Sequence, residues 1–198
     1  MKTRSRYQRI GIFGGTFDPP HLGHLIIAEQ ACEQLRLDKL LFVPAYLAPH
    51  KKKGGRANPL QRLHMVKMSI SVNRKFEAAP VEIRRKGVSY TVDTLRELRS
   101  EYGRAAFYLI VGGDNYATIR SWKSVNEILR MATIVVYRRE HPGIRSRTKR
   151  VQRHTRLRGA MLDISSTMIR NRVKQGESIR FLVTENVRRF IEKNKLYL

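Results

Sequence analysis

Residues 10–35 combine two apolar runs with a glycine-rich turn, and this combination restricts the chain to few folds. Residues 10–13 form a short apolar run beside glycines, which predicts a buried strand. Residues 22–35 carry apolar side chains at helical spacing, which predicts a helix. The turn between them, residues 14–21, therefore leads from a strand into a helix N-terminus, and we call it the first turn. At such a position, free backbone N–H groups and a partial positive charge favour an anion.

Two histidines stand at the start of this predicted helix. His21 and His24 are three residues apart and so share one helix face, and Gly23 between them lets a ligand approach the backbone. The turn matches neither the P-loop pattern nor the dinucleotide G-x-G-x-x-G pattern. We interpret the histidines as phosphate contacts. The alternatives are a plain tight turn with solvated histidines and a metal site, for which the sequence offers no clear third ligand.

A second strand-to-helix turn is predicted near the C-terminus. Residues 160–164 predict a short strand, and Ser165, Ser166 or Thr167 suits the N-cap of the helix that follows. Hydroxyl and N–H groups at such a helix start hold phosphate oxygens, and Arg170 can add a bidentate guanidinium. Taken alone, this segment is better explained as a capped amphipathic helix with an exposed arginine. Two such turns together fit the switch point of an open parallel sheet.

Strand and helix patterns alternate, which predicts an α/β, Rossmann-like fold with an open, mostly parallel sheet and helices on both faces. We expect strands over 40–43, 106–111 and 132–137, strand or extended chain over 76–80 and 81–83, and helices over 59–73, 91–102 and 121–130. The length predicts a single domain, 1–198. Within it, residues 138–159 carry nine Lys or Arg against one acid and predict a mobile basic loop, and 165–198 predict a C-terminal helical part.

The chain has one cysteine, Cys32, which excludes an internal disulfide and fits a reducing compartment. Its place on the apolar face of the first helix predicts a packed thiol. The apolar runs are far too short to span a bilayer, and the basic N-terminus lacks the apolar stretch of a signal peptide. We therefore expect a cytoplasmic protein without a membrane partner.

The two turns resemble the nucleotidyltransferase superfamily with the H-x-G-H signature. The matching stretches are GGTFDPPHLGH over 14–24 and ISSTMIR over 164–170. Further segments over 43–51, 89–95 and 112–122 narrow the resemblance to the bacterial nicotinate-nucleotide adenylyltransferase family, whose members make deamido-NAD from nicotinate mononucleotide and ATP. One departure is Ala48, where the family usually has a proline.

The resemblance implies which residues form the site. His21, His24 and Arg170 would be catalytic, and Trp122 would stack on the pyridine ring. ATP contacts would come from Gly14, Gly15, Thr16, Phe17, Gly23, Lys51, Ser166, Thr167 and Arg170, and nicotinate mononucleotide contacts from Thr91, Asp114, Trp122 and Lys123. Mg²⁺ is expected with ATP, held mainly by ATP oxygens and water, with no protein metal site. Nicotinamide mononucleotide and phosphopantetheine remain alternative acceptors.

The formal net charge of +24 exceeds what a nucleotide site needs. Nucleic-acid binding through 138–158 and 51–53 is the competing interpretation. The basic segment lacks the interleaved aromatic residues of single-strand binders, and no helix-turn-helix or zinc pattern occurs. We therefore favour a solvated basic surface over a nucleic-acid partner. The sequence leaves the oligomeric state open, a homo-oligomer included.

Overall fold

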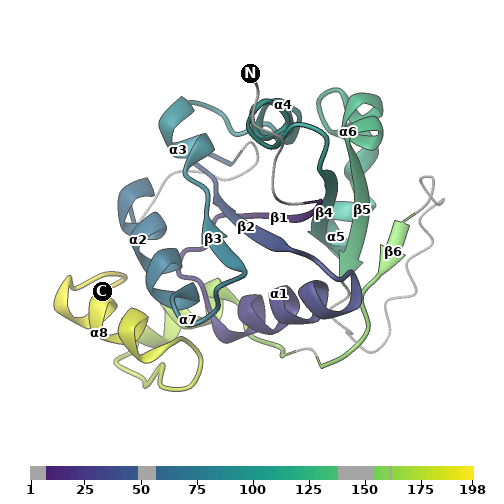
Figure 1. Ribbon diagram of the computed structural model, residues 1–198. Helices are drawn as coiled ribbons and strands as arrows, with labels where there is room; N and C mark the ends of the chain where they lie inside the picture. Colours follow the sequence, from purple (N-terminus) through teal and green to yellow (C-terminus); the bar gives the residue numbers. More distant parts are fainter. Residues whose placement is uncertain (1–7, 49–56, 138–153, 161) are drawn as a thin grey trace.

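A computed structural model describes residues 8–48, 57–137, 154–160 and 162–198, and its centre is a six-stranded parallel sheet (Figure 1). The strands are β1 (Arg9–Gly15), β2 (Lys39–Pro44), β3 (Phe76–Ala78), β4 (Ala106–Gly112), β5 (Ala132–Tyr137) and β6 (His154–Arg156). Their order is β3-β2-β1-β4-β5-β6, and each neighbouring pair is parallel. The chain moves outward from β1 in one direction and then from β4 in the other, so the topological switch point lies between β1 and β4. The predicted fold class is confirmed.

Helices cover both faces of the sheet, as Figure 1 shows: α4 and α6 lie on one side, and α1 and α2 on the other. The helices are α1 (Leu22–Gln34), α2 (Pro59–Ile70), α3 (Val81–Arg85), α4 (Thr91–Tyr102), α5 (Gly113–Ala117), the 3₁₀ turn η1 (Ile119–Ser121), α6 (Val125–Met131), α7 (Ser166–Lys174) and α8 (Glu185–Lys193). Because both sheet faces are covered, the middle residues of the central strands are mostly buried and apolar, whereas β1 and β2 begin with the basic residues Arg9 and Lys39.

Side chains on the two faces of β1 pack into two separate cores. Ile10 and Ile12 pack in the core under α4 and α6, whereas Phe13 packs in the core under α1 and α2. Cys32 of α1 belongs to the second core and is only 2 % exposed. Burial, with a smaller contribution from the charge of Glu29, raises the pKa of its thiol to about 12. The prediction of a packed thiol is confirmed.

A third core lies away from the sheet and joins the C-terminal helices to α2. Met65 of α2, Ile169 of α7, and Val187 and Ile191 of α8 are all buried in it. Figure 1 shows α7 and α8 gathered beside the lower end of α2. Packing in this core fixes the position of the start of α7 relative to β1, and the candidate site described below depends on that position.

Local signals located several elements correctly. Asn58 caps α2: its Oδ1 accepts the N–H of Gln61 at 2.9 Å, and the Gln61 side chain returns a bond to the Asn58 N–H at 2.9 Å. Pro59 takes the first helical position, where its missing N–H costs nothing. At the C-terminal end of α4, Gly103 adopts φ +60°, a conformation that suits glycine and ends the helix.

Three predicted elements were wrong. Residues 81–83 belong to the short helix α3, whose first three residues are buried. The helix expected over 121–130 begins only at Val125, because Ser124 is left-handed (φ 54°, ψ 43°) and interrupts it. The described residues of 160–164 form no strand.

The sixth strand lies instead within the segment predicted to be a loop. His154–Arg156 forms β6, which pairs with β5 from Ile134 to Val136. This edge strand is polar and largely exposed, so it lacks the apolar pattern from which strands are predicted. Residues 138–153 lie outside the described residues. Within the described ranges, no helix is long and apolar enough to cross a membrane.

Candidate functional site

The carboxyl ends of the central strands open onto one cavity of about 840 Å³. This is the edge at which open α/β sheets bind their ligands. The sequence-predicted residues that line it are Gly14, Gly15, Thr16, Phe17, His21, His24, Thr91, Trp122, Lys123, Ser166, Thr167 and Arg170. Both predicted turns therefore face one cavity, and His24 and Arg170 share its wall.

The two glycines of the first turn have different structural roles. A Cβ added to Gly14 would meet no protein atom within 4 Å, so this backbone is bare toward open space. A Cβ on Gly15 would lie 2.9 Å from the ring of Phe17, which folds back over the turn. Phe17 itself is buried at φ 50° and packs edge-on against Phe13, with ring centroids 5.7 Å apart. The turn is thus held rigidly by aromatic packing.

His21 and His24 stack on each other at the start of α1. Their ring centroids are 3.6 Å apart, and the ring of His24 also contacts Phe17, with centroids 5.0 Å apart. The backbone N–H of His21 donates to Nδ1 of His24 at 3.1 Å. Because a backbone amide can only donate, Nδ1 is the acceptor and a neutral His24 carries its proton on Nε2. The predicted pairing of the two imidazoles is present.

The start of α7 is fastened directly to the first turn. Ser165 caps the helix, its Oγ accepting the N–H of Met168 at 3.1 Å. The hydroxyl of Ser166 donates to the carbonyl of Pro19 at 2.8 Å. The guanidinium of Arg170 donates to the carbonyl of Asp18 at 2.8 Å and to Oγ1 of Thr167 at 3.0 Å. These bonds bring two segments that are far apart in sequence to one side of the cavity.

The opposite wall of the cavity comes from the start of α4 and the chain after η1. Thr91 is the first residue of α4, and Trp122 is half-buried against the core under that helix. The ammonium of Lys123 lies 4.4 Å from the ring centroid of Tyr90 and 3.3 Å from the carboxylate of Asp93. This wall therefore offers an aromatic face, a helix N-terminus and a cation.

Two predicted site residues that the structure describes, Gly23 and Asp114, do not line this cavity. A Cβ on Gly23 would stand 3.1 Å from Nδ1 of His21, so this glycine makes room for the histidine ring rather than for a ligand. Asp114 is exposed in α5, and its neighbour Asn115 lines the cavity instead. Lys51 lies outside the described residues.

Sequence reasoning missed Glu82, a buried carboxylate in the cavity wall. Its Oε1 accepts the hydroxyl of Thr94 at 2.6 Å, and the side chain is 8 % exposed. Burial raises the pKa of Glu82, opposed by hydrogen bonds from Thr94 and Ser89 and by the charge of Arg85. In the sequence, Glu82 precedes two arginines and resembles an ordinary surface charge, so no local signal identifies it.

Arg62 is a second residue that the sequence did not single out. Its side chain is 4 % exposed and donates to the carbonyls of Thr16 at 2.8 Å, Tyr46 at 3.1 Å and Ala57 at 3.3 Å. A guanidinium can satisfy three carbonyls from one buried point, which an ammonium does less well. Arg62 therefore ties the first turn to the segments after β2 and before α2.

Comparisons with known proteins agree with this architecture. A sequence model of the cytidylyltransferase-like family matches residues 12–172, which contain both turns. A protein of Exiguobacterium sibiricum, named a probable nicotinate-nucleotide adenylyltransferase, is 41 % identical over 189 residues, covering 96 % of this chain and 98 % of its own. One of Shouchella clausii with the same name is 38 % identical over 190 residues, covering 96 % and 97 %.

The chain belongs to the nicotinate-nucleotide adenylyltransferase family. It is therefore an enzyme of the nucleotidyltransferase class. The nicotinic acid mononucleotide adenylyltransferase of Plasmodium falciparum, solved with NaAD, has the same fold at a TM-score of 0.80 and 19 % identity, with 96 % of this chain and 97 % of that one covered. At that identity the likeness concerns the fold alone.

Proposed function

We propose that this protein transfers the adenylyl group of ATP to nicotinate mononucleotide, releasing pyrophosphate and forming deamido-NAD in NAD biosynthesis. The observation that carries the proposal is that two groups of residues with different binding properties line one cavity. One side holds two helix starts with His21, His24 and Arg170, which suit a polyphosphate, and the other holds Thr91 and Trp122, which suit an aromatic carboxylate.

The chemistry asks the protein for alignment and charge stabilisation more than for a base. A phosphate oxygen of the acceptor nucleotide, already an anion at pH 7, attacks the α-phosphorus of ATP. A new P–O bond forms as the bond to the β-phosphate breaks, and pyrophosphate leaves with that electron pair. The site must hold the two nucleotides in line and stabilise the charge on the phosphate oxygens.

Each side of the cavity takes one part of this task. The Nε2–H of His24 and the backbone N–H groups of the first turn donate to the phosphates of ATP. Ser166, Thr167 and Arg170 hold the departing β- and γ-phosphates at the start of α7. Trp122 stacks on the pyridine ring, and the N–H groups at Thr91 and beyond Trp122 receive the carboxylate.

Mg²⁺ belongs to the proposal as the counter-ion of ATP. Among the residues that the structure describes, no three His, Cys, Asp or Glu side chains lie close enough together to hold a metal ion. We infer that Mg²⁺ is held mainly by the phosphate oxygens of ATP and by water, and that the bound ion offsets phosphate charge. A cytoplasmic location and a single domain remain predictions.

A parallel acceptor assay tests the proposed reaction. The protein is incubated with ATP, Mg²⁺ and, separately, nicotinate mononucleotide, nicotinamide mononucleotide or phosphopantetheine, and pyrophosphate release is measured. We expect nicotinate mononucleotide to give the highest kcat/KM, because N–H donors suit its carboxylate. A preference for phosphopantetheine, or no release with any acceptor, would exclude the proposal.

His24→Ala tests the catalytic role of the stacked histidines. We expect kcat to fall by about 10²–10³-fold, the usual effect of losing one donor to transition-state charge. His64→Ala is the matched control, since His64 lies on α2 with its ring against Phe190, 5.0 Å between centroids. The control should keep normal turnover. Wild-type turnover in a folded His24→Ala variant would show that the assigned role is wrong.

A further inference from the structure

The segment that follows α8, residues 194–198, reaches back to the first turn. The hydroxyl of Tyr197 donates to Oδ1 of Asp18 at 2.8 Å, a bond between residues 179 positions apart. The N–H of Ala57 donates to the same oxygen at 3.2 Å. Asp18 is 1 % exposed, so these two donors bond a carboxylate oxygen that water hardly reaches.

Asp18 connects the parts of the site that face the polyphosphate. It directly follows Thr16 and Phe17, and all three residues line the cavity. Its carbonyl accepts the guanidinium of Arg170 at 2.8 Å, and that side chain lines the cavity from the other helix start. A shift of Asp18 would therefore displace both the first turn and Arg170.

The segment after α8 is held in a conformation that isolated chains avoid. Lys195 and Tyr197 have φ values of 49° and 71°, in the left-handed region where side chains are disfavoured. Such residues persist when surrounding contacts over-determine them. Here Leu196 and Tyr197 pack against the core of α2, α7 and α8, and the Leu196 N–H donates to the carbonyl of Ile191 at 3.0 Å.

The Tyr197 hydroxyl is suited to act as a permanent donor. Its burial and the neighbouring Asp18 carboxylate raise its pKa above the usual tyrosine value, whereas the charges of Arg170 and Arg62 act in the opposite direction. The phenol therefore keeps its proton at every pH at which the protein works.

We propose that Tyr197 is a positioning residue, which acts through Asp18 to hold residues 14–18 and Arg170 in the geometry that binds the ATP phosphates. This role rests on the proposed function, since it assigns ATP to that half of the cavity. Residues 194–198 thereby support the active site from outside, since Tyr197 is not among the residues that line the cavity.

Tyr197→Phe tests the proposal, because it removes one oxygen and keeps the ring. We expect the KM for ATP and the dissociation constant of a non-hydrolysable ATP analogue, measured by calorimetry, to rise about tenfold, the effect of one lost hydrogen bond to a charged group. The KM for the acceptor nucleotide should change less than about twofold, since separate elements hold that wall. Tyr108→Phe is the matched control, a tyrosine of β4 whose ring packs under the guanidinium of Arg9.

A purely structural role gives a different result. It would lower the melting temperature of Tyr197→Phe and leave the affinity for the ATP analogue unchanged, and that outcome overturns the proposal. A double-mutant cycle isolates the pair: in an Asp18→Asn background, the tyrosine substitution should weaken analogue binding far less than in the wild type. Equal effects in both backgrounds would show that Tyr197 does not act through Asp18.

Hydrogen exchange on the wild-type protein tests the same coupling without any substitution. If the ATP analogue favours the bound position of Tyr197, linkage requires that it slow amide exchange over residues 195–198. We expect about tenfold slowing there. Slowing over 14–18 with unchanged exchange over 195–198 would contradict the proposal. Analogue binding needs no acceptor turnover, so these results are independent of which acceptor the enzyme uses.

Discussion

Adjacent glycines in the first turn meet different constraints. Gly15 is required by the protein itself, since a Cβ there would lie 2.9 Å from the Phe17 ring. Gly14 meets no such contact and has an ordinary φ, so the fold tolerates a side chain there. Because Gly14 lines the cavity, its lack of a side chain leaves room for the proposed ligand to approach the backbone.

Gly14→Ala should therefore separate binding from stability. We expect the free energy of unfolding to stay within about 0.5 kcal/mol of wild type, because the methyl group enters open space. The KM for ATP should rise at least about tenfold, because the methyl group occupies volume that the phosphates need. Chemical denaturation and steady-state kinetics measure the two effects. Unchanged ATP kinetics would show that the phosphates do not approach this backbone.

The short helix α3 brings a buried acid to the cavity wall. Glu82 accepts from Thr94 of α4, and Arg85 of α3 donates to the same Thr94 hydroxyl at 3.1 Å. Ser89, which also bonds Glu82, accepts the backbone N–H of Tyr46 at 2.9 Å. The network therefore links α3, α4 and the chain after β2 around the proposed acceptor half of the site.

Glu82 should make stability depend on pH in a defined direction. Its pKa is raised in the folded state, so the folded protein binds this proton more tightly than the unfolded chain does. The contribution of Glu82 to stability is therefore greatest below the ordinary glutamate pKa of about 4.3 and declines as the pH rises from there through the folded pKa. Glu82→Gln cannot ionise and should gain stability relative to wild type over that window.

Thermal unfolding at a series of pH values between 4 and 8 measures this effect. The melting temperatures of Glu82→Gln and wild type should differ least at the acid end and diverge as the pH increases. Glu101→Gln, an exposed substitution on α4, controls for the loss of one negative charge. A difference that does not vary with pH, or one equal to that of the control, would refute the assignment.

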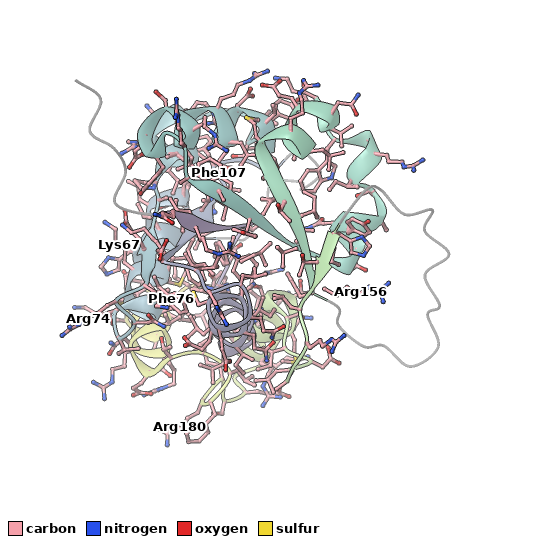
Figure 2. The ribbon with its side chains drawn as sticks, turned by 45° about the vertical axis from the view of Figure 1, so that its right-hand side comes forward. Lys67, Arg74, Phe76, Phe107, Arg156 and Arg180 are labelled. Carbon is pink, nitrogen blue, oxygen red and sulfur yellow. The ribbon has the colours of Figure 1, made fainter. Side chains whose placement is uncertain are left out.

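The positive charge of the molecule is spread over its surface. Figure 2 shows Lys67, Arg74, Arg156 and Arg180 extending outward on different sides of the fold, and all four are exposed. With a net charge of +24, such a distribution creates a positive field around the whole protein. This field attracts both nucleotide substrates, and any polyanion, without specific recognition.

Salt should consequently weaken substrate capture and leave the chemical step unaffected. Raising the ionic strength from 0.1 to 1 M shortens the Debye length from about 10 Å to about 3 Å. We expect the KM for ATP to rise about tenfold, the lower end of electrostatic steering, with kcat within about twofold. Steady-state kinetics across this range tests the expectation. A parallel fall of kcat would mean that salt disturbs the site itself.

Nucleic-acid titrations at about 0.15 M salt distinguish nonspecific attraction of polyanions from specific nucleic-acid binding. Unrelated DNA or RNA sequences should bind with equal affinity, because contacts to phosphates carry no sequence information. Selective binding of one sequence or structure would instead support a nucleic-acid partner, the alternative that the composition left open.

Local patterns were sufficient for most of the sheet, for the first turn and for the start of α7, although not for the strand expected before that helix. β1, β2, β4 and β5 are apolar runs because both faces of a parallel sheet are buried, and Asn58 and Gly103 mark helix ends through their own backbone chemistry. The same reasoning failed where long-range contacts override local preference. β6 is a polar strand that exists through pairing with β5, and Glu82 is buried because α3 and α4 pack together.

The amino-acid order alone predicted two helix starts suited to an anion, an alternating α/β chain and the residue types expected of a phosphate site, since each depends on spacing over a few residues. That the two helix starts share one cavity depends on bonds such as Ser166 to Pro19 and Arg170 to Asp18, across 147 and 152 positions of the chain. Packing in the core of α2, α7 and α8 positions the two helix starts relative to each other, and so does the hydrogen bond of Tyr197 to Asp18. Such contacts arise from the packing of distant surfaces, which no local pattern encodes.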